Sequence, residues 1–483
     1  PRSLSERSES KGPTSKADAS ARLRLAQRPG GETLSTRIAE FVVTAPALPA
    51  ELDERMRLLH LDYVAVTLGG ADRPSAAAAR AAVPTSPEPT LFTPARVRGA
   101  DAWASVVDAA LVNGTTAHGL ELDDTHEEAS MHPGVVVFAA VEAVADALAA
   151  AGETPSRADL LRAAAVGYDV MAAVGILLGA AESYGRGFHP TGVDGAVGAA
   201  AAVAALRGED AAVAANAVSI AATIASGSLE FLSDGSWTKR LNAGNAAATG
   251  IRAADLARAG FLGPVAAFEG RDGFLALYGR GAVEGRELRL ERGAGVLATS
   301  VKFYPCCRYM HGGIDLLRGI RAEHPDLRLE DVERIEVGVI EAGATLVSVP
   351  AEAKQRIESA VDAQFSMPFG AAVALATGEA TVAQFDDAPA VARELAGWMA
   401  KVDCVTSPRL EAAFPARWQG EVAVHLADGR VIEAFEPAFV GSPGAGITRD
   451  AVVAKARTLL PPARADNIIA QLLDAPPTVP ISD

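Results

Sequence analysis

The sequence predicts a mainly α-helical protein, in which a large all-helical domain carries a smaller α+β lid domain. Two observations support this fold class. From Thr33 to about Ala298, apolar residues recur at helical spacing, and alanine and glycine dominate the apolar faces. Beyond Val301, short segments alternate between polar and apolar residues as strands do. A chain of 483 residues is also too long for one simple domain.

The helical part consists of successive segments with apolar faces. The first, residues 51–70, ends in a glycine pair, which is a typical helix stop signal. The pattern returns in residues 134–153, 156–179, 194–208 and 208–228. Because small residues let helix backbones approach closely, we expect a compact multi-helix domain. The most apolar run, residues 211–229, also contains Asn, Ser and Thr, so we predict a buried helix there and no membrane span.

The lid is expected from strand-like alternation in residues 332–342, 420–429 and 431–439. The Asp428-Gly429 pair between the last two segments is a strong hairpin signal. A helical stretch, residues 361–379, interrupts the strands. The predicted organisation is therefore a disordered tail over 1–32, a helical domain over 33–298, a lid over 299–441 and C-terminal helices over 442–483 that dock on the helical domain.

Composition and charge narrow the class of partners. A net charge of −16 argues against nucleic acids and anionic membranes, which carry the same sign. It leaves room for a small anionic substrate bound by a local group of cations. The 3 cysteines are an odd number for a disulfide framework, and two of them are adjacent. The polar N-terminal tail lacks the apolar centre of a secretory signal. We therefore expect a cytoplasmic protein.

The most unusual stretch is HGLELDDTHEEASMHPG, residues 118–134, which holds 3 of the chain's 8 histidines. A metal site is one interpretation, although the spacing of three or four typical of helical His ligands is absent. An acidic motif that binds diphosphate through magnesium is another, but the chain is only 5% aromatic and shows no second metal motif. The third is a metal-free proton-transfer site.

Three further stretches carry reactive side chains on turns. His189 lies on a Gly/Pro loop before a helix rich in glycine and alanine. Lys239 and Arg240 precede a second small-residue helix, and Lys302 begins a crowded segment that also contains Cys307. Lysine and arginine suit carboxylate binding, and histidine suits proton removal beside a carboxylate. Since the dinucleotide fingerprint is absent, a polycarboxylate lyase, decarboxylase or epimerase is expected.

Together these stretches resemble the 2-methylcitrate dehydratase / cis-aconitate decarboxylase family, also called MmgE/PrpD. The resemblance rests on NGTTAHGLELDDTH…HPG, GFHPTGVDGAVGAAAAVAAL, TKRLNAGNAAATGIRAADLARAGFLGPVAAFEG, VKFYPCCRYMHGGIDLL and AQFSMPFGAAVAL, in this order along the chain. It implies a site between the helical domain and the lid, a homodimer, no metal or organic cofactor, and a small di- or tricarboxylate substrate.

The resemblance also indicates site residues. The catalytic candidates are His132, His189, Lys239 and Lys302, and the substrate-binding candidates are Glu121, Thr125, Arg308 and Cys307. Glu121 falls where the decarboxylases carry Asp. Asp123 and Asp124 are expected to shape the loop or tune His132, whereas His118, His126, Glu127 and Glu128 are expected to be mostly scaffold and surface.

Two departures from the decarboxylase branch bear on the reaction. That branch has His where this chain has Cys307 and Tyr where it has Phe369, and it has one residue fewer between Thr125 and His132. Arg308 is a candidate carboxylate clamp instead. We therefore expect a dehydratase-type lyase. The alternatives are an epimerase or decarboxylase of a related carboxylate, a metal-dependent helical enzyme, and a family member without catalytic activity.

Overall fold

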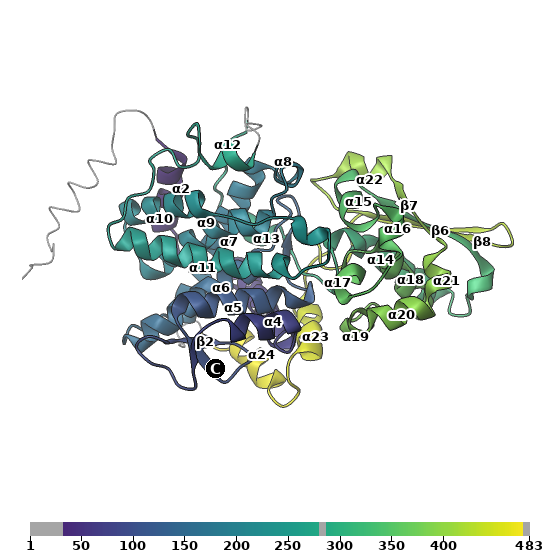
Figure 1. Ribbon diagram of the computed structural model, residues 1–483, viewed down its shortest axis with the longest axis horizontal. Helices are drawn as coiled ribbons and strands as arrows, with labels where there is room; N and C mark the ends of the chain where they lie inside the picture. Colours follow the sequence, from purple (N-terminus) through teal and green to yellow (C-terminus); the bar gives the residue numbers. More distant parts are fainter. Residues whose placement is uncertain (1–31, 280–285, 477–483) are drawn as a thin grey trace, which may run out of the picture.

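The computed structural model describes residues 32–279 and 286–476, so the predicted N-terminal tail lies almost wholly outside the described residues. Figure 1 shows a larger helical lobe and a smaller lobe that combines helices with a sheet. The predicted fold class, mainly α with a smaller α+β part, is confirmed. Each lobe has its own cluster of buried apolar side chains.

Helices build the larger lobe, and those that coincide with the predicted segments begin and end within about four residues of the expected bounds. The helices are α2 (Leu34–Val43), α3 (Ala50–Gly69), α4 (Pro74–Ala81), α5 (Val106–Ala117), α6 (Gly134–Ala150), α7 (Arg157–Leu178), α8 (Ala180–Gly185), α9 (Pro190–Arg207), α10 (Ala211–Ile224), α11 (Thr238–Arg258), α12 (Phe274–Tyr278) and α13 (Ala294–Leu297). By length and composition α7 could cross a membrane, but 89% of its most apolar window is buried inside the protein.

Small residues set the distances between these helices. α11 packs against both α9 and α5. A Cβ atom added at Gly250 of α11 would lie 2.4 Å from the Cβ of Ala199 in α9, and one at Gly244 would meet Thr115 of α5 at 2.4 Å. Such approaches are possible only without a side chain. They place the N-termini of α9 and α11, which carry His189 and Lys239, beside the end of α5.

The larger lobe also contains short strands that were not predicted. β1 (Thr85–Ser86), β2 (Ala95–Val97) and β3 (Ala102–Ala104) form an antiparallel sheet in the order β1-β3-β2. A second pair, β4 (Thr125–His126) and β5 (Thr299–Ser300), is antiparallel and joins two distant parts of the chain.

The lid has a four-stranded sheet in the order β7-β6-β8-β9, where β6 and β7 are parallel and the other pairs antiparallel. The strands are β6 (Val332–Val339), β7 (Val402–Thr406), β8 (Gly420–Leu426) and β9 (Val431–Glu436). The predicted β8–β9 hairpin is present, with Gly429 at a φ of 86°. The helices are α14 (His311–Glu323), α15 (Glu341–Val347), α16 (Ala351–Lys354), α17 (Ala360–Gln364), α18 (Met367–Thr377), α19 (Val382–Asp386), α20 (Ala388–Glu394), α21 (Ala396–Met399) and α22 (Pro408–Ala413).

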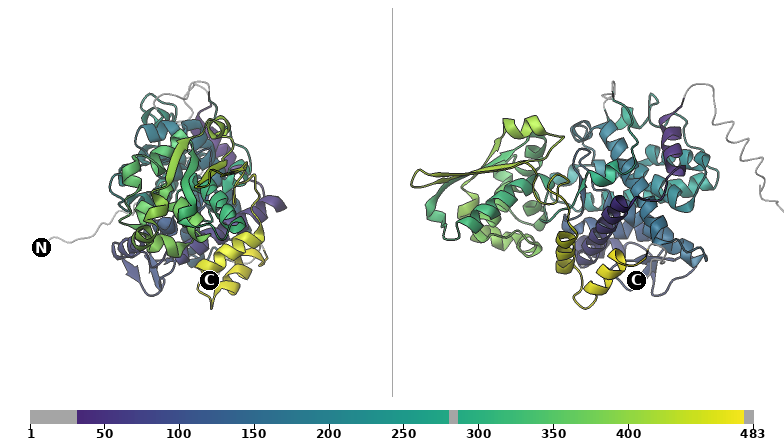
Figure 2. Two further views of the ribbon diagram at one scale, coloured as in Figure 1. Left: turned by 90° about the vertical axis from the view of Figure 1, so that its right-hand side faces the viewer. Right: turned by 180° about the vertical axis from the view of Figure 1, so that it is seen from behind.

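After the lid the chain returns to the larger lobe. Helices α23 (Arg449–Leu459) and α24 (Ala465–Leu473) pack against α3, and Figure 2 shows them in yellow beside the purple α3. Lys455 of α23 forms a buried ion pair with Asp62 at 2.5 Å and donates to the carbonyl of Leu122 at 2.6 Å. Lys455 of the C-terminal helices therefore holds the segment that contains Leu122 in place through this hydrogen bond.

Asp194 of α9 is a buried carboxyl whose Oδ1 finds no hydrogen-bond partner in the described part of the chain. Burial raises its pKa well above the usual range. The unfolded chain releases this proton above about pH 4, so the folded state is penalised increasingly as the pH rises from there. We expect Asp194→Asn to raise the free energy of unfolding by about 1.4 kcal/mol for each pH unit above 4, up to the folded pKa.

Urea unfolding at pH 5 and pH 8 checks this expectation. The exposed Asp101→Asn serves as the control, because its carboxyl lies in water in both states. An Asp194→Asn gain of equal size at both pH values would show that ionisation of Asp194 does not limit stability.

Candidate functional site

A pocket of about 460 Å³ lies where the two lobes meet, and both lobes line it. Seven of the eight predicted site residues are in its wall: Glu121, Thr125, His132, His189, Lys239, Cys307 and Arg308. The eighth, Lys302, lies behind the wall and reaches it through Glu121. The loops that precede helices thus converge on one cavity.

The backbone of the first stretch is tightly constrained. After α5, a single 3-10 turn over His118–Leu120 leads to Glu121, which has a left-handed φ of 55°. This conformation costs a residue with a side chain about 1 kcal/mol or more and points to a functional constraint. The loop ends at Gly134, where a Cβ atom would lie 2.8 Å from the Oδ2 atom of Asp124. Only glycine therefore fits this start of α6.

Glu121 is held by two buried lysines. Lys302 donates from Nζ to Oε1 of Glu121 at 3.0 Å and to its carbonyl at 3.1 Å, and Lys239 forms a second ion pair with the same oxygen. Burial alone would raise the pKa of Glu121, but the two ammonium groups outweigh it and hold the pKa well below the usual range. Burial lowers the pKa of Lys239, while Glu121 and Asp123 overcome burial at Lys302 and raise its pKa.

His118 and Asp123 lie behind the pocket wall and form a connected group with His132, which is part of the wall. Both carboxylate oxygens of Asp123 lie 2.9 Å from Nδ1 of His118, and Oδ2 lies 3.2 Å from Nδ1 of His132. Nδ1 of His132 also lies 2.8 Å from the backbone carbonyl of Asp124, which can only accept a hydrogen bond. Nδ1 of His132 therefore carries the proton, and its Nε2 is an open acceptor.

The pKa values of this group follow from its surroundings. Burial lowers the pKa of His132 to about 4, so the ring is neutral at neutral pH. Burial acts to raise the pKa of Asp123, but the neighbouring imidazoles reverse this and lower it well below the usual range. Burial raises the pKa of Asp124 to about 8, against the hydrogen bond donated by Tyr168 at 2.6 Å. The predicted influence of Asp123 on His132 thus has a direct structural basis.

In His189 the ring proton lies on the other nitrogen atom than in His132. It is the N-cap residue of α9, and burial lowers its pKa well below the usual range. The amide nitrogen of Asn242 lies 3.4 Å from Nδ1 of His189 and donates to the carbonyl of Ser228 at 3.1 Å, which fixes the orientation of the amide. Nδ1 of His189 therefore accepts, and the proton of the neutral ring lies on Nε2.

Arg308 and Cys307 approach the pocket from the lid. The guanidinium of Arg308 is already bound by Glu127 at 3.0 Å, by the carbonyl of Val440 at 3.2 Å and by His311 at 3.1 Å. Glu127 would have to release it before Arg308 could clamp a substrate, a role that stays a prediction. Burial raises the pKa of the Cys307 thiol, which is protonated at neutral pH.

Several parts of the site were not predicted from the sequence. His118 is 0% exposed and His126 is 1% exposed, so neither is at the surface, and His118 pairs with Asp123. Phe369 packs edge-on against Phe385 at 5.2 Å in the lid core and is not among the residues of the pocket wall. The unpredicted wall residues include Ser130, Tyr184, Tyr309 and Trp418. Ser130, Tyr184 and Tyr309 lie within or close to stretches that the sequence had singled out, whereas apart from the rarity of tryptophan no sequence signal marked Trp418.

Among the residues that the structure describes, His118, Asp123 and His132 could hold a metal, since their ligand atoms lie within 4.8 Å of one another. The donor set of two imidazoles and a carboxylate suits zinc. However, the positive charge of Lys302 acts on both Asp123 and His132. A nearby ammonium opposes a divalent cation.

Comparison with known proteins agrees with the resemblance. The family model of the MmgE/PrpD N-terminal domain matches residues 36–285, and that of the C-terminal domain matches residues 304–474. Cis-aconitate decarboxylase of Aspergillus terreus is 28% identical, covering 70% of this chain and 71% of its own length. The cis-aconitate decarboxylase-like protein oryM of Aspergillus oryzae is 28% identical over 80% and 82%. Human cis-aconitate decarboxylase is 35% identical over 35% of this chain and 34% of its own.

Proposed function

The chain belongs to the MmgE/PrpD family and is an enzyme of the lyase type that acts on a carboxylate, and from this premise we propose that it dehydrates a small di- or tricarboxylate without a metal or organic cofactor. One observation carries the proposal. Two neutral histidines of opposite tautomer, His132 and His189, line the same pocket beside the ammonium group of Lys239.

Lys239 is the group that binds the substrate. Its ammonium has three donors, of which Glu121 takes one, so others are free for a substrate carboxylate. Lys302 lies behind the same glutamate and adds a second positive charge. When a proton leaves the carbon next to the carboxylate, negative charge spreads onto the carboxylate oxygens. The lysines stabilise this developing enolate, whose formation is the most demanding step of the reaction.

The histidines move the protons. Nε2 of His132 takes the proton from the carbon beside the carboxylate, while Thr125 and Asp123 near its Nδ1 hold the ring in place. The electron pair of the broken C–H bond forms the C=C bond, and the C–O bond to the leaving hydroxyl breaks. That hydroxyl takes the Nε2 proton of His189 and leaves as water, and the imidazolate left at His189 is stabilised by the positive charge of Lys239. Exchange with solvent then returns a proton to His189 and removes one from His132.

Decarboxylation is the second candidate, because relatives that match most of this chain are named cis-aconitate decarboxylases. In that case the electron pair of the broken C–C bond passes to the substrate, carbon dioxide leaves, and a proton donor of the pocket wall protonates the resulting carbanion. The protonated thiol of Cys307 is a further donor on the pocket wall.

A turnover screen tests the proposed reaction. Purified enzyme is given 2-methylcitrate, citrate, cis-aconitate and amino-dicarboxylates in deuterated water, and the products are analysed by mass. We expect loss of water with no deuterium bound to carbon in the product, because a proton leaves the carbon beside the carboxylate and none is added to carbon. Loss of carbon dioxide would establish decarboxylation, and deuterium uptake without loss of mass would indicate epimerisation.

Metal content is measured on the same sample. We expect activity to survive a chelator, with less than stoichiometric zinc, manganese or magnesium by elemental analysis. A stoichiometric metal, lost together with activity, would reject the metal-free mechanism and make His118, Asp123 and His132 the first candidates for its ligands.

A further inference from the structure

Three hydroxyl groups meet on the wall of the candidate site and take no part in the proposed reaction. They belong to Ser130 and Tyr184 of the larger lobe and to Tyr309 of the lid. The Oγ atom of Ser130 lies 2.6 Å from the hydroxyl oxygen of Tyr184. After burial, Tyr184 and Ser130 have the largest influence on the pKa of Tyr309, so the three groups are close neighbours. We call them the hydroxyl cluster.

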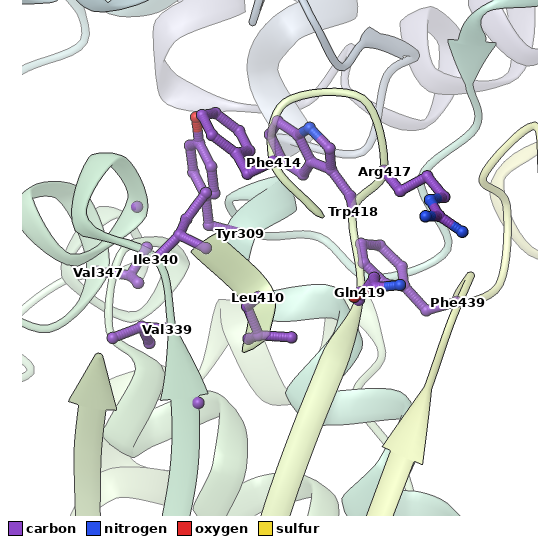
Figure 3. Close-up of a pocket in the computed structure, with 12 residues that line it drawn as sticks. Tyr309, Val339, Ile340, Val347, Leu410, Phe414, Arg417, Trp418, Gln419 and Phe439 are labelled. Carbon is purple, nitrogen blue, oxygen red and sulfur yellow. The ribbon is translucent and has the colours of Figure 1, made fainter. Parts of the chain in front are cut away.

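The backbone and the packing hold the hydroxyl cluster in place. Ser130 has a left-handed φ of 49°, which costs a residue with a side chain about 1 kcal/mol or more. The ring of Tyr309 stacks on that of Trp418 with centroids 4.4 Å apart and planes 18° from parallel. On its other contact, a Cβ atom at Gly343 would lie 2.8 Å from the same ring. Figure 3 shows Tyr309 beside Phe414 and Trp418, with its hydroxyl oxygen pointing away from the strands of the lid.

The electrostatic surroundings of the hydroxyl cluster do not favour an anion. Burial raises the pKa of Tyr184 and of Tyr309, and the carboxylates of Glu121 and Glu127, respectively, raise these pKa values further. Both phenols are therefore protonated at neutral pH, and the ionised side chains that act most strongly on them are carboxylates. A substrate carboxylate in front of the cluster would meet these like charges. The ammonium of Lys239, by contrast, attracts one.

The hydrogen-bonding capacity of the cluster also differs from that of Lys239. An ammonium only donates, whereas a hydroxyl group donates and accepts. The hydrogen bond between Ser130 and Tyr184 uses one of the three hydroxyl protons, and lone pairs remain on the oxygen atoms. A bound hydroxyl or carboxamide, which also donates and accepts, can satisfy both kinds of group. A carboxylate can only accept, so it would leave lone pairs of the cluster without a donor.

We propose that the hydroxyl cluster is a subsite for an uncharged oxygen group of the substrate, a hydroxyl or a carboxamide, while Lys239 binds a carboxylate. This proposal rests on the proposed function, because both groups belong to the molecule that loses water. It narrows the substrate class. A tricarboxylate would have to bring a further charge against the cluster, whereas a dicarboxylate that carries a hydroxyl or carboxamide group would not.

Three ligands with a common skeleton test the proposal. Citramalate carries a methyl group where citrate carries a carboxymethyl arm, and in citrate monoamide the carboxylate of this arm is a carboxamide. For the native enzyme we expect kcat/KM to be about fivefold or more higher for the monoamide than for citramalate, because one neutral hydrogen bond contributes about 1 kcal/mol. Citrate should gain nothing over citramalate, since its arm is charged.

Two variants assign the gain to the hydroxyl cluster. Tyr184→Phe and Tyr309→Phe each remove one hydroxyl and keep the ring, and each should lower the ratio of kcat/KM for the monoamide to that for citramalate by about fivefold. A ratio between two substrates cancels any general loss of activity. Tyr278→Phe is the matched control, because its hydroxyl donates to the carbonyl of Ala225 at 2.6 Å and lies outside the pocket wall. An unchanged ratio in both cluster variants would overturn the proposal.

Calorimetric affinities of the same ligands separate this proposal from the proposed function. If the native enzyme binds the monoamide more tightly than citramalate, the two cluster variants do not, and nothing is turned over, the subsite stands and the dehydration is rejected. Equal affinities of the native enzyme for these two ligands would overturn the subsite, whatever the turnover. A gain for citrate as large as that for the monoamide would also overturn it, because the cluster would then accept a carboxylate.

Discussion

Replacing His132 by glutamine is expected to lower kcat/KM by about 10²- to 10⁴-fold, the usual contribution of a positioned general base. Glutamine keeps the polarity and much of the volume of the ring but cannot take a proton from carbon. Steady-state kinetics on the substrate found by the turnover screen measures the loss. The exposed His324→Gln is the matched control, because this residue lies far along the lid helix at the C-terminal end of α14.

The pH profile distinguishes a base from a residue that only supports the structure. Burial holds the pKa of His132 at about 4, so its Nε2 is unprotonated at neutral pH. Log kcat/KM of the native enzyme should therefore be flat around neutrality and fall as the pH drops through about 4. Asp123→Asn should lower kcat, because an amide can donate to Nδ1 and favour the wrong tautomer. Full turnover by a folded His132→Gln enzyme would remove His132 from the mechanism.

The sequence specified the architecture wherever a pattern was long enough to be periodic. Residues 51–70 and 156–179 repeat apolar positions over several turns, and they became α3 and α7 within about one residue of the expected bounds. The β8–β9 hairpin followed from Asp428-Gly429, because that turn requires a residue tolerant of positive φ. Strands of two or three residues, such as β1 and β2, are too short to show a period of two and could not be predicted.

The candidate site was predictable only in part. A Gly/Pro loop before a small-residue helix marked His189, a polar segment at the start of another marked Lys239, which lies in the first turn of α11, and family resemblance marked His132. The pairing of His118 with Asp123 depends on a 3-10 turn followed by the left-handed backbone of Glu121, and neither leaves a sequence pattern. The ion pair of Arg308 with Glu127 joins positions 181 residues apart. Contacts of this kind arise from tertiary packing alone.

Replacing Lys302 by methionine is expected to lower the free energy of unfolding by about 3–5 kcal/mol at neutral pH, the cost of breaking a buried ion pair by removing one partner. Lys302 is 0% exposed, and its ammonium satisfies both the carboxylate and the carbonyl of Glu121. Methionine fills the space but leaves both oxygens with fewer donors. Urea unfolding measures the loss, and Lys354→Met, which loses a hydrogen bond to one carbonyl, should cost about 1 kcal/mol.

The pH dependence of this loss identifies Glu121 as the cause. The two lysines hold the pKa of Glu121 well below its usual range, so its ionisation contributes stability that is present above about pH 4.3 and is lost as the pH falls towards the folded pKa. The deficit of Lys302→Met should therefore shrink below about pH 4. Glu121→Gln combined with Lys302→Met should cost less than the two single variants together, since no carboxylate then remains unpaired. A deficit that is independent of pH, or additive with Glu121→Gln, would show that Lys302 stabilises the fold through its methylenes and not by holding Glu121 in its strained conformation.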